Sequence, residues 1–186
     1  MHLDEDIKIA GDKPSVDVRL NRLKDAAGEE FSPEDIKKAK KLGEIIAEKY
    51  IAEAQKALEG DEGDFGYETL LQRRLLLSFT ATVGFERFCK SDTLAGLAQK
   101  SFIDRLRAES EEMYKTSSDT GAFSFYYLAF RRGGEIERRM GQTFAMLCSH
   151  DGDPIFQERG EALYCWFSAE IRKTVCELKL DKHNKK

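Results

Sequence analysis

The sequence predicts an all-α protein, an antiparallel up-and-down bundle of about five long helices with a short helix or hairpin at the N-terminus. Only three prolines occur in 186 residues, and since an interior proline breaks a helix, long helices are allowed. Apolar residues recur every three or four positions along most of the chain, which is the period of one helical stripe. The segment 68–89 is apolar on more than one helical face, so other helices must surround it. We therefore expect it to be the central helix.

The length of the chain suits one helical domain. We expect this domain to cover residues 31–180. An N-terminal extension, residues 1–30, would precede it, and a polar, frayed tail, residues 181–186, would follow it.

The N-terminal extension allows two interpretations. Ser15 and Gly28 are placed to cap and to end a short helix over residues 16–27. Alternatively, residues 7–10 and 16–20 flank the turn sequence GDKPS and could form a hairpin. We prefer a loose terminus followed by the short helix.

The first long helix is predicted to begin at Pro33. Ser32 is a good N-cap residue, proline fits the first helical position, and Glu34 and Asp35 suit the positive end of the helix dipole. Apolar residues then recur at helical spacing as far as Leu58, with lysines and glutamates between them. The glycine-rich and acidic run that follows is expected to end this helix.

After the central helix, Ser91 or Asp92 is expected to cap a third long helix. Its apolar stripe continues as far as Met113. The sequence TSSDT, residues 116–120, is expected to form a loop and to supply the next N-cap.

Residues 121–149 form a fourth predicted segment, which opens with an aromatic run and contains Gly133-Gly134 in its middle. Each glycine costs a helix about 1 kcal/mol relative to alanine, so the pair marks either a kink or a close approach of helices. Pro154 begins the last helix, whose apolar stripe runs to Leu178. Because the connections are short, sequential helices should be antiparallel neighbours. The main alternative is a bundle interrupted at the glycine pair, with roughly six or seven helices and some oblique crossings.

The composition excludes several classes of protein. A net charge of −4 gives no overall attraction to nucleic acid or to an anionic membrane. The longest uncharged run of the central helix, residues 75–85, is much shorter than the roughly 20 residues that span a bilayer. The acidic start lacks the apolar core of a signal peptide. We expect a soluble, cytoplasmic protein without a membrane partner, whose four cysteines are reduced core residues.

No cofactor is predicted. The chain has no P-loop, GxGxxG or GxSxG sequence. None of its three histidines follows a glutamate at the spacing of a carboxylate-bridged metal site. The nearest approach to a metal site is Cys148, His150, Asp151 and Asp153, but an ordinary turn followed by an N-cap explains the same residues. We therefore assign no catalytic residue and no metal ligand.

Three arginine pairs are the most unusual feature of the sequence. One pair interrupts the most apolar helix, and the other two are seven residues apart, on nearly the same helical face. The six residues are Arg73, Arg74, Arg131, Arg132, Arg138 and Arg139. Because a guanidinium near a buried region needs a partner, they could form a site for an anion or an acidic partner between the second and fourth helices. The favoured alternative is a set of structural salt bridges, with Glu68, Glu135, Glu137 or Glu170.

The aromatic run is a second candidate site. Tyr126 and Tyr127 cannot point the same way from one helix, so one of them should lie at a surface, an interface or the mouth of a pocket. Together with Trp166, Phe123 and Phe130 they could line a cavity between helices, a usual place for a small ligand. The favoured alternative is that these aromatic residues belong to the core.

The leading functional hypothesis is a non-enzymatic helical interaction or regulatory module that binds a protein partner or self-associates as a homodimer. The alternative is a bundle that binds a small ligand, an apolar acid or a phosphorylated molecule, in an aromatic and arginine pocket. A third hypothesis covers a DNA-binding regulator or an enzyme with a dispersed site. Nucleic acid is disfavoured because Glu34 and Asp35 open the helix that would approach phosphate.

Overall fold

The structure is a computed structural model that describes residues 31–59, 66–118, 121 and 123–182. The regular structure of these residues is helical, apart from a single antiparallel bridge between Cys89 and Asp181. The prediction of an all-α protein is therefore confirmed. The short helix or hairpin predicted in the N-terminal extension lies outside the described residues, as does the end of the predicted tail.

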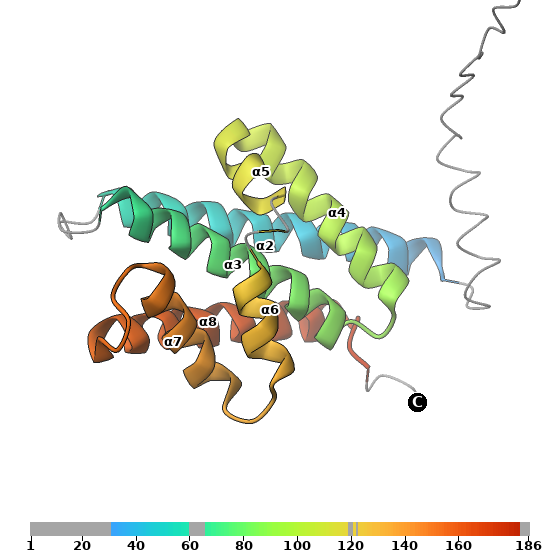
Figure 1. Ribbon diagram of the computed structural model, residues 1–186. Helices are drawn as coiled ribbons and strands as arrows, with labels where there is room; N and C mark the ends of the chain where they lie inside the picture. The colour runs from blue at the N-terminus through green and yellow to red at the C-terminus, as the bar shows by residue number, and fades with distance from the viewer. Residues whose placement is uncertain (1–30, 60–65, 119–120, 122, 183–186) are drawn as a thin grey trace, which may run out of the picture. The chain divides into compact units, whose positions relative to one another are not determined.

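Seven helices are described, in the order in which Figure 1 labels them. They are α2 (Pro33–Glu59), α3 (Tyr67–Phe88), α4 (Asp92–Glu109), α5 (Glu111–Ser118), α6 (Ser124–Arg131), α7 (Ile136–Leu147) and α8 (Pro154–Glu177). The predicted count of five long helices is not confirmed, because the third and fourth predicted segments each contain two helices. The up-and-down arrangement is not confirmed either.

The predicted third helix is divided because the backbone leaves the helical conformation at Ser110, with φ −158° and ψ 129°. The N–H of Ser110 closes α4 by donating to the carbonyl of Leu106 at 2.9 Å. Its hydroxyl accepts from the N–H of Met113 at 3.4 Å, as a cap of α5. α5 then continues to Ser118, so the first three residues of the predicted TSSDT loop are helical.

α3 lies among the other helices and packs against α2, α4, α5, α7 and α8. Its bounds agree with the predicted central helix to within one residue at each end. Leu76 and Phe79 in its middle are fully buried. Two of its buried hydroxyls are hydrogen-bonded: the hydroxyl oxygens of Ser78 and Ser117 in α5 are 2.7 Å apart, and Thr80 donates to the carbonyl of Leu76. A helix that is apolar on several faces is thus covered on several sides.

The largest packing contacts join α2 to α4, α7 to α8, and α3 to α8. Two glycines allow the close approach of the first two pairs. A Cβ atom at Gly43 would overlap the carbonyl oxygen of Ala98 in α4, and one at Gly141 would overlap the carbonyl oxygen of Gln157 in α8. Only α7 and α8 are consecutive helices, so short connections do not determine the main packing partners here.

The four cysteines are free thiols. Cys89 and Cys148 are buried, as predicted for core residues, but Cys165 and Cys176 are exposed on α8. These two are eleven residues apart and therefore share one helical face. The prediction of a core position is wrong for this pair, because α8 packs through a different face that includes Phe167.

The segment after α8 packs against the end of α3. Leu180 is fully buried, and its carbonyl accepts from the N–H of Lys90 at 2.7 Å. The bridge between Cys89 and Asp181 follows directly. The first residue of the predicted frayed tail is therefore paired.

Candidate functional site

Side chains from the end of α6, from α7, from the turn that follows α7 and from the start of α8 line a groove with a volume of about 320 Å³. Its four α7 residues are spaced at i, i+3, i+4 and i+7, so they share one helical face. That face is opposite to the buried one, which includes Met140, Gly141 and Phe144. We call this site the α6–α7 groove. It is lined by Ala129, Arg132, Arg139, Gln142, Thr143, Met146, Asp151 and Gln157.

The Gly133-Gly134 turn brings two of the predicted arginines to this groove. The two glycines have φ values of +64° and +69°, a left-handed conformation that residues with a Cβ atom rarely adopt. Hydrogen bonds close the turn, from the N–H of Gly133 to Phe130 at 3.3 Å and from the N–H of Ile136 to Gly134 at 2.8 Å. The pair is therefore a sharp break between α6 and α7 (Figure 1).

Arg139 is held in position by this turn. Its Nη1 donates to the carbonyl oxygen of Gly133 at 2.5 Å, and its side chain is half-buried. A guanidinium has five N–H donors in a planar fork, so donors remain for a ligand. Because the fork is positioned before a ligand binds, less conformational entropy is lost on binding.

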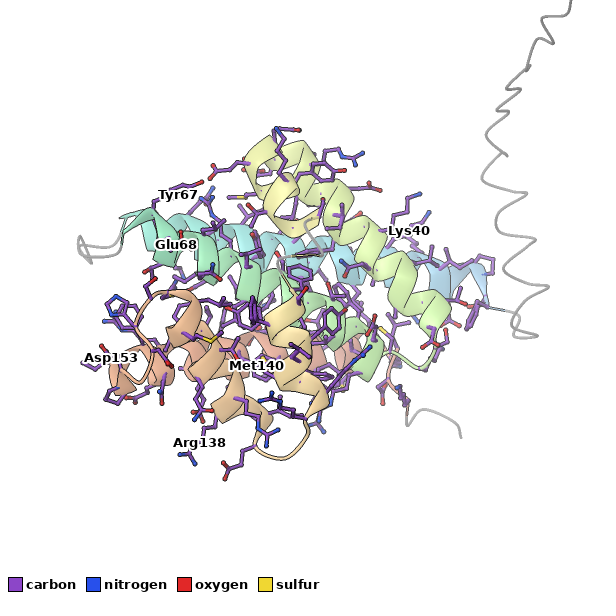
Figure 2. The ribbon with its side chains drawn as sticks, viewed as in Figure 1. Lys40, Tyr67, Glu68, Arg138, Met140 and Asp153 are labelled. Atoms are coloured by element: carbon purple, nitrogen blue, oxygen red, sulfur yellow. The ribbon has the colours of Figure 1, made fainter. Side chains whose placement is uncertain are left out.

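The doublets Arg131-Arg132 and Arg138-Arg139 are each divided between the groove and the outer surface. Arg132 and Arg139 line the groove, whereas Arg131 and Arg138 do not. Arg138 forms an exposed pair with Glu135, with 3.3 Å between Nη1 and Oε2. Figure 2 shows Arg138 at the outer edge of α7 and Met140 among the helices. Each doublet thus supplies one groove residue and one neighbour outside it.

Large apolar side chains are exposed beside the groove. Met146 lines it and is 41% exposed, while Phe125 and Leu128 on α6 are 53% and 58% exposed. Phe125, Leu128 and Arg132 are spaced at i, i+3 and i+7, so they form one stripe, which we call the α6 stripe. Ala129 connects this stripe to the groove. Exposed apolar groups next to charged ones are typical of binding surfaces.

The other predicted arginines, Arg73 and Arg74, form ion pairs away from the groove. Arg73 Nη2 lies 2.7 Å from Glu53 Oε1 in α2, and Arg74 Nη1 lies 2.6 Å from Glu112 Oε1 in α5. In the described residues, neither arginine pairs with a glutamate that the sequence suggested as its partner. The structure therefore does not bring all three doublets into one site.

The aromatic residues of α6 pack around Phe79 of α3. The ring centroid of Phe79 lies 5.5 Å from that of Tyr126 and 5.1 Å from that of Tyr127, and it also contacts Phe123 and Phe130. Tyr126 is fully buried, whereas Tyr127 is half-buried. Burial raises the pKa of Tyr126 well above its ordinary value. None of these aromatic residues lines the α6–α7 groove.

Trp166 lies on α8, where it is 40% exposed and stacks on Phe167 with 5.5 Å between centroids. In the described part of the chain, no ring contact joins it to Tyr126 or Tyr127. The pocket that the sequence suggested between these three residues is therefore not brought together.

Sequence reasoning missed most of the groove. Gln142, Thr143 and Met146 follow Arg139 on the outer face of α7, and this helical spacing was a usable signal. Asp151, in the turn between α7 and α8, and Gln157 on α8 gave no such signal, because they reach the groove only when the chain turns back and α8 packs against α7.

The residues near His150 form a turn and an N-cap. The His150 ring stacks on Phe156 with 3.7 Å between centroids, and its Nδ1 lies 3.9 Å from Asp153 Oδ2. Asp153 also caps α8 by accepting from the N–H of Ile155 at 2.8 Å. Burial raises the pKa of the Cys148 thiol to about 11. The described residues contain no group of three or more side chains that could bind a metal ion.

Within the described ranges, no helix is long and apolar enough to cross a membrane. Comparison with known proteins adds no relative: no protein-family model, no curated protein and no solved structure matches the chain.

Proposed function

We propose that this protein is a non-enzymatic helical interaction module that binds a partner protein through the α6 stripe. The observation that supports this is the pair Phe125 and Leu128, each more than half exposed. Fully burying one such side chain is worth about 1.5–3 kcal/mol. Helix α6 buries Tyr126 and Ala129 instead, so the stripe is left for a partner.

The packing that holds α6 against α3 also supports a binding role. The helix has only eight residues, too few to be stable alone in water. The packing of Tyr126 and Tyr127 on Phe79 holds it in place. A stripe on a fixed helix loses little conformational entropy when a partner binds, which favours affinity.

A small anionic ligand is the second candidate. The groove volume of about 320 Å³ falls at the lower end of the range for ligand pockets, about 300–1,000 Å³. Arg132 and Arg139 could pair with a carboxylate or phosphate, and an apolar acid could place its chain against Ala129 and Met146. This candidate does not need Leu128, whereas a protein partner on the α6 stripe does.

The proposal includes a cytoplasmic location. It is supported by the four free cysteines, since thiols persist in a reducing compartment. The partner can also be a second copy of the same chain.

The proposal is tested by placing a photo-crosslinking amino acid at position 128 of the full chain in cells. Lys40 is the matched control, because it is exposed on a different helix (Figure 2). We expect a discrete adduct from position 128 that is absent from position 40 and is lost when Phe125→Glu is added. An adduct of two copies of the chain would identify self-association. No adduct at position 128, or the same adducts from both positions, would contradict the proposal.

A further inference from the structure

We infer that the α6–α7 groove is a receptor for a carboxylate, and that the partner segment carries an aspartate or glutamate beside large apolar side chains. This inference rests on the proposed function, since the carboxylate enters the groove while the apolar side chains cover the α6 stripe. The partner is thus an acidic, apolar peptide segment.

The charge of the groove favours an anion with a single charge. Arg132 and Arg139 are positive and Asp151 is negative, so the lining is positive by one unit, although the whole chain has a net charge of −4. One carboxylate neutralises this lining. A phosphate monoester, with about −1.5 to −2 charges at pH 7, would leave an excess negative charge beside Asp151.

Hydrogen-bond donors are available on several sides of the groove. Arg139 is fixed by the carbonyl of Gly133 through Nη1, and its other N–H groups remain for a carboxylate, which arginine can bind in a bidentate way. Further donors are the side-chain amide of Gln142 and the hydroxyl of Thr143, on the same face of α7, and the side-chain amide of Gln157 on α8. A carboxylate accepts at about four lone-pair sites, which these donors can fill.

The apolar surface beside the arginines distinguishes a peptide from a free acid. Ala129 and Met146 lie within the lining, while Phe125 and Leu128 continue from Arg132 along α6. A small acid in the groove would leave Phe125 and Leu128 exposed. A peptide with apolar residues on either side of its acid covers them, so the groove and the α6 stripe serve one occupant.

The test uses three matched, fluorescein-labelled peptides and the full-length protein. The first has one glutamate flanked by leucines, the second has glutamine in place of that glutamate, and the third has phosphoserine in its place. Fluorescence anisotropy measures the dissociation constant of each. We expect the glutamate peptide to bind about tenfold more tightly than the glutamine peptide, because a charged hydrogen-bonded pair is lost. The phosphoserine peptide is expected to bind more weakly than the glutamate peptide.

The arginine doublets provide matched controls. Arg132→Gln and Arg139→Gln are each expected to weaken binding of the glutamate peptide about tenfold. Arg131→Gln and Arg138→Gln change the adjacent residues outside the groove and are expected to leave binding within about twofold. Arg139 also holds the turn, so Arg132→Gln keeps the test valid if the Arg139 variant does not fold.

Several results would overturn the inference. Equal binding of the glutamate and glutamine peptides, or equal losses in the groove variants and their controls, would exclude a carboxylate receptor. If Leu128→Glu abolished binding while Arg132→Gln and Arg139→Gln left it unchanged, the α6 stripe alone would be the partner site and the groove would not be a carboxylate receptor. Tighter binding of the phosphoserine peptide would assign the groove to phosphate. If no peptide bound, the inference would fail, and crosslinking from position 128 would still decide the proposed function independently.

Discussion

The guanidinium of Arg139 donates a hydrogen bond to the carbonyl oxygen of Gly133, across the break that separates α6 from α7. The bond ties the first turn of α7 to a backbone that only glycine adopts easily, since Gly133 and Gly134 both have positive φ. The conformation of the turn and the position of an arginine in the groove are therefore coupled.

Gly133→Ala is expected to lower the free energy of unfolding by about 1–2 kcal/mol, the cost of a left-handed conformation for a residue with a Cβ atom. No atom lies within 4 Å of the added Cβ, so the loss comes from the backbone and not from a clash. Urea denaturation followed by circular dichroism measures it.

Gly96→Ala is the matched control. Gly96 is exposed within α4, and its added Cβ also meets no atom within 4 Å. There alanine is expected to raise the free energy of unfolding by up to about 1 kcal/mol, because it is the better helix former. Similar stability for the two variants would show that the turn at Gly133 is not constrained.

Local signals in the sequence predicted the starts of helices well. Pro33 begins α2 as predicted, and the Ser91 hydroxyl caps α4 by accepting from the N–H of Leu94. These signals could be identified because capping involves neighbouring residues only. The breaks within the predicted helices were harder to predict, because a glycine pair in a helical pattern is equally consistent with a kink, a packing contact or a turn. Ser110 is followed by Glu111 and Glu112, which is also an N-cap pattern, but the apolar stripe continues past it to Met113 and favoured one helix.

The groove could be predicted only in part. The doublets identified Arg132 and Arg139, because residues seven apart share a helical face, whereas their neighbours Arg131 and Arg138 are about 100° away around the helix. Which apolar stripes pack together depends on contacts distant in sequence, such as those of α3 with α8. One sequence does not specify these, so the contributions of Asp151 and Gln157 were unpredictable.

The pair Arg73–Glu53 is expected to stabilise the fold more than the pair Arg138–Glu135. The side chains of the first pair are 21% and 19% exposed, against 64% and 74% for the second. Water and salt screen exposed ion pairs strongly. Double-mutant cycles with alanine should give a coupling energy of about 1 kcal/mol for Arg73–Glu53 and below about 0.5 kcal/mol for Arg138–Glu135. Equal coupling energies would contradict this difference in burial.

Two of the four thiols are expected to react with Ellman's reagent in the native protein. Cys165 and Cys176 are exposed, whereas Cys89 and Cys148 are buried. Burial raises the pKa of the Cys89 thiol to about 12 and that of Cys148 to about 11. Because only the thiolate attacks, this pair should react after denaturation only. A variant with Cys165→Ser and Cys176→Ser should show no fast phase, and a remaining fast thiol would contradict the burial of the other two.

Tyr126→Phe is expected to leave the stability at pH 7 unchanged or to raise it by about 1 kcal/mol. The Tyr126 hydroxyl is buried and has no hydrogen-bond partner among the described residues, and an unsatisfied buried polar group is costly. Urea denaturation at pH 7 measures the change. A loss of more than about 1 kcal/mol would show that the hydroxyl has a partner.

The same variant should change the stability at alkaline pH. Burial holds the pKa of Tyr126 well above its ordinary value, which is about 10 in the unfolded chain. Above that pH the unfolded state loses the phenol proton while the folded state keeps it, so the free energy of unfolding falls as pH rises. Below that pH, the Tyr126 phenol is neutral in both the folded and the unfolded state, so it adds no pH dependence to the free energy of unfolding. Denaturation at several pH values should therefore show a shallower alkaline decline for Tyr126→Phe, and an unchanged slope would mean that Tyr126 ionises equally in both states.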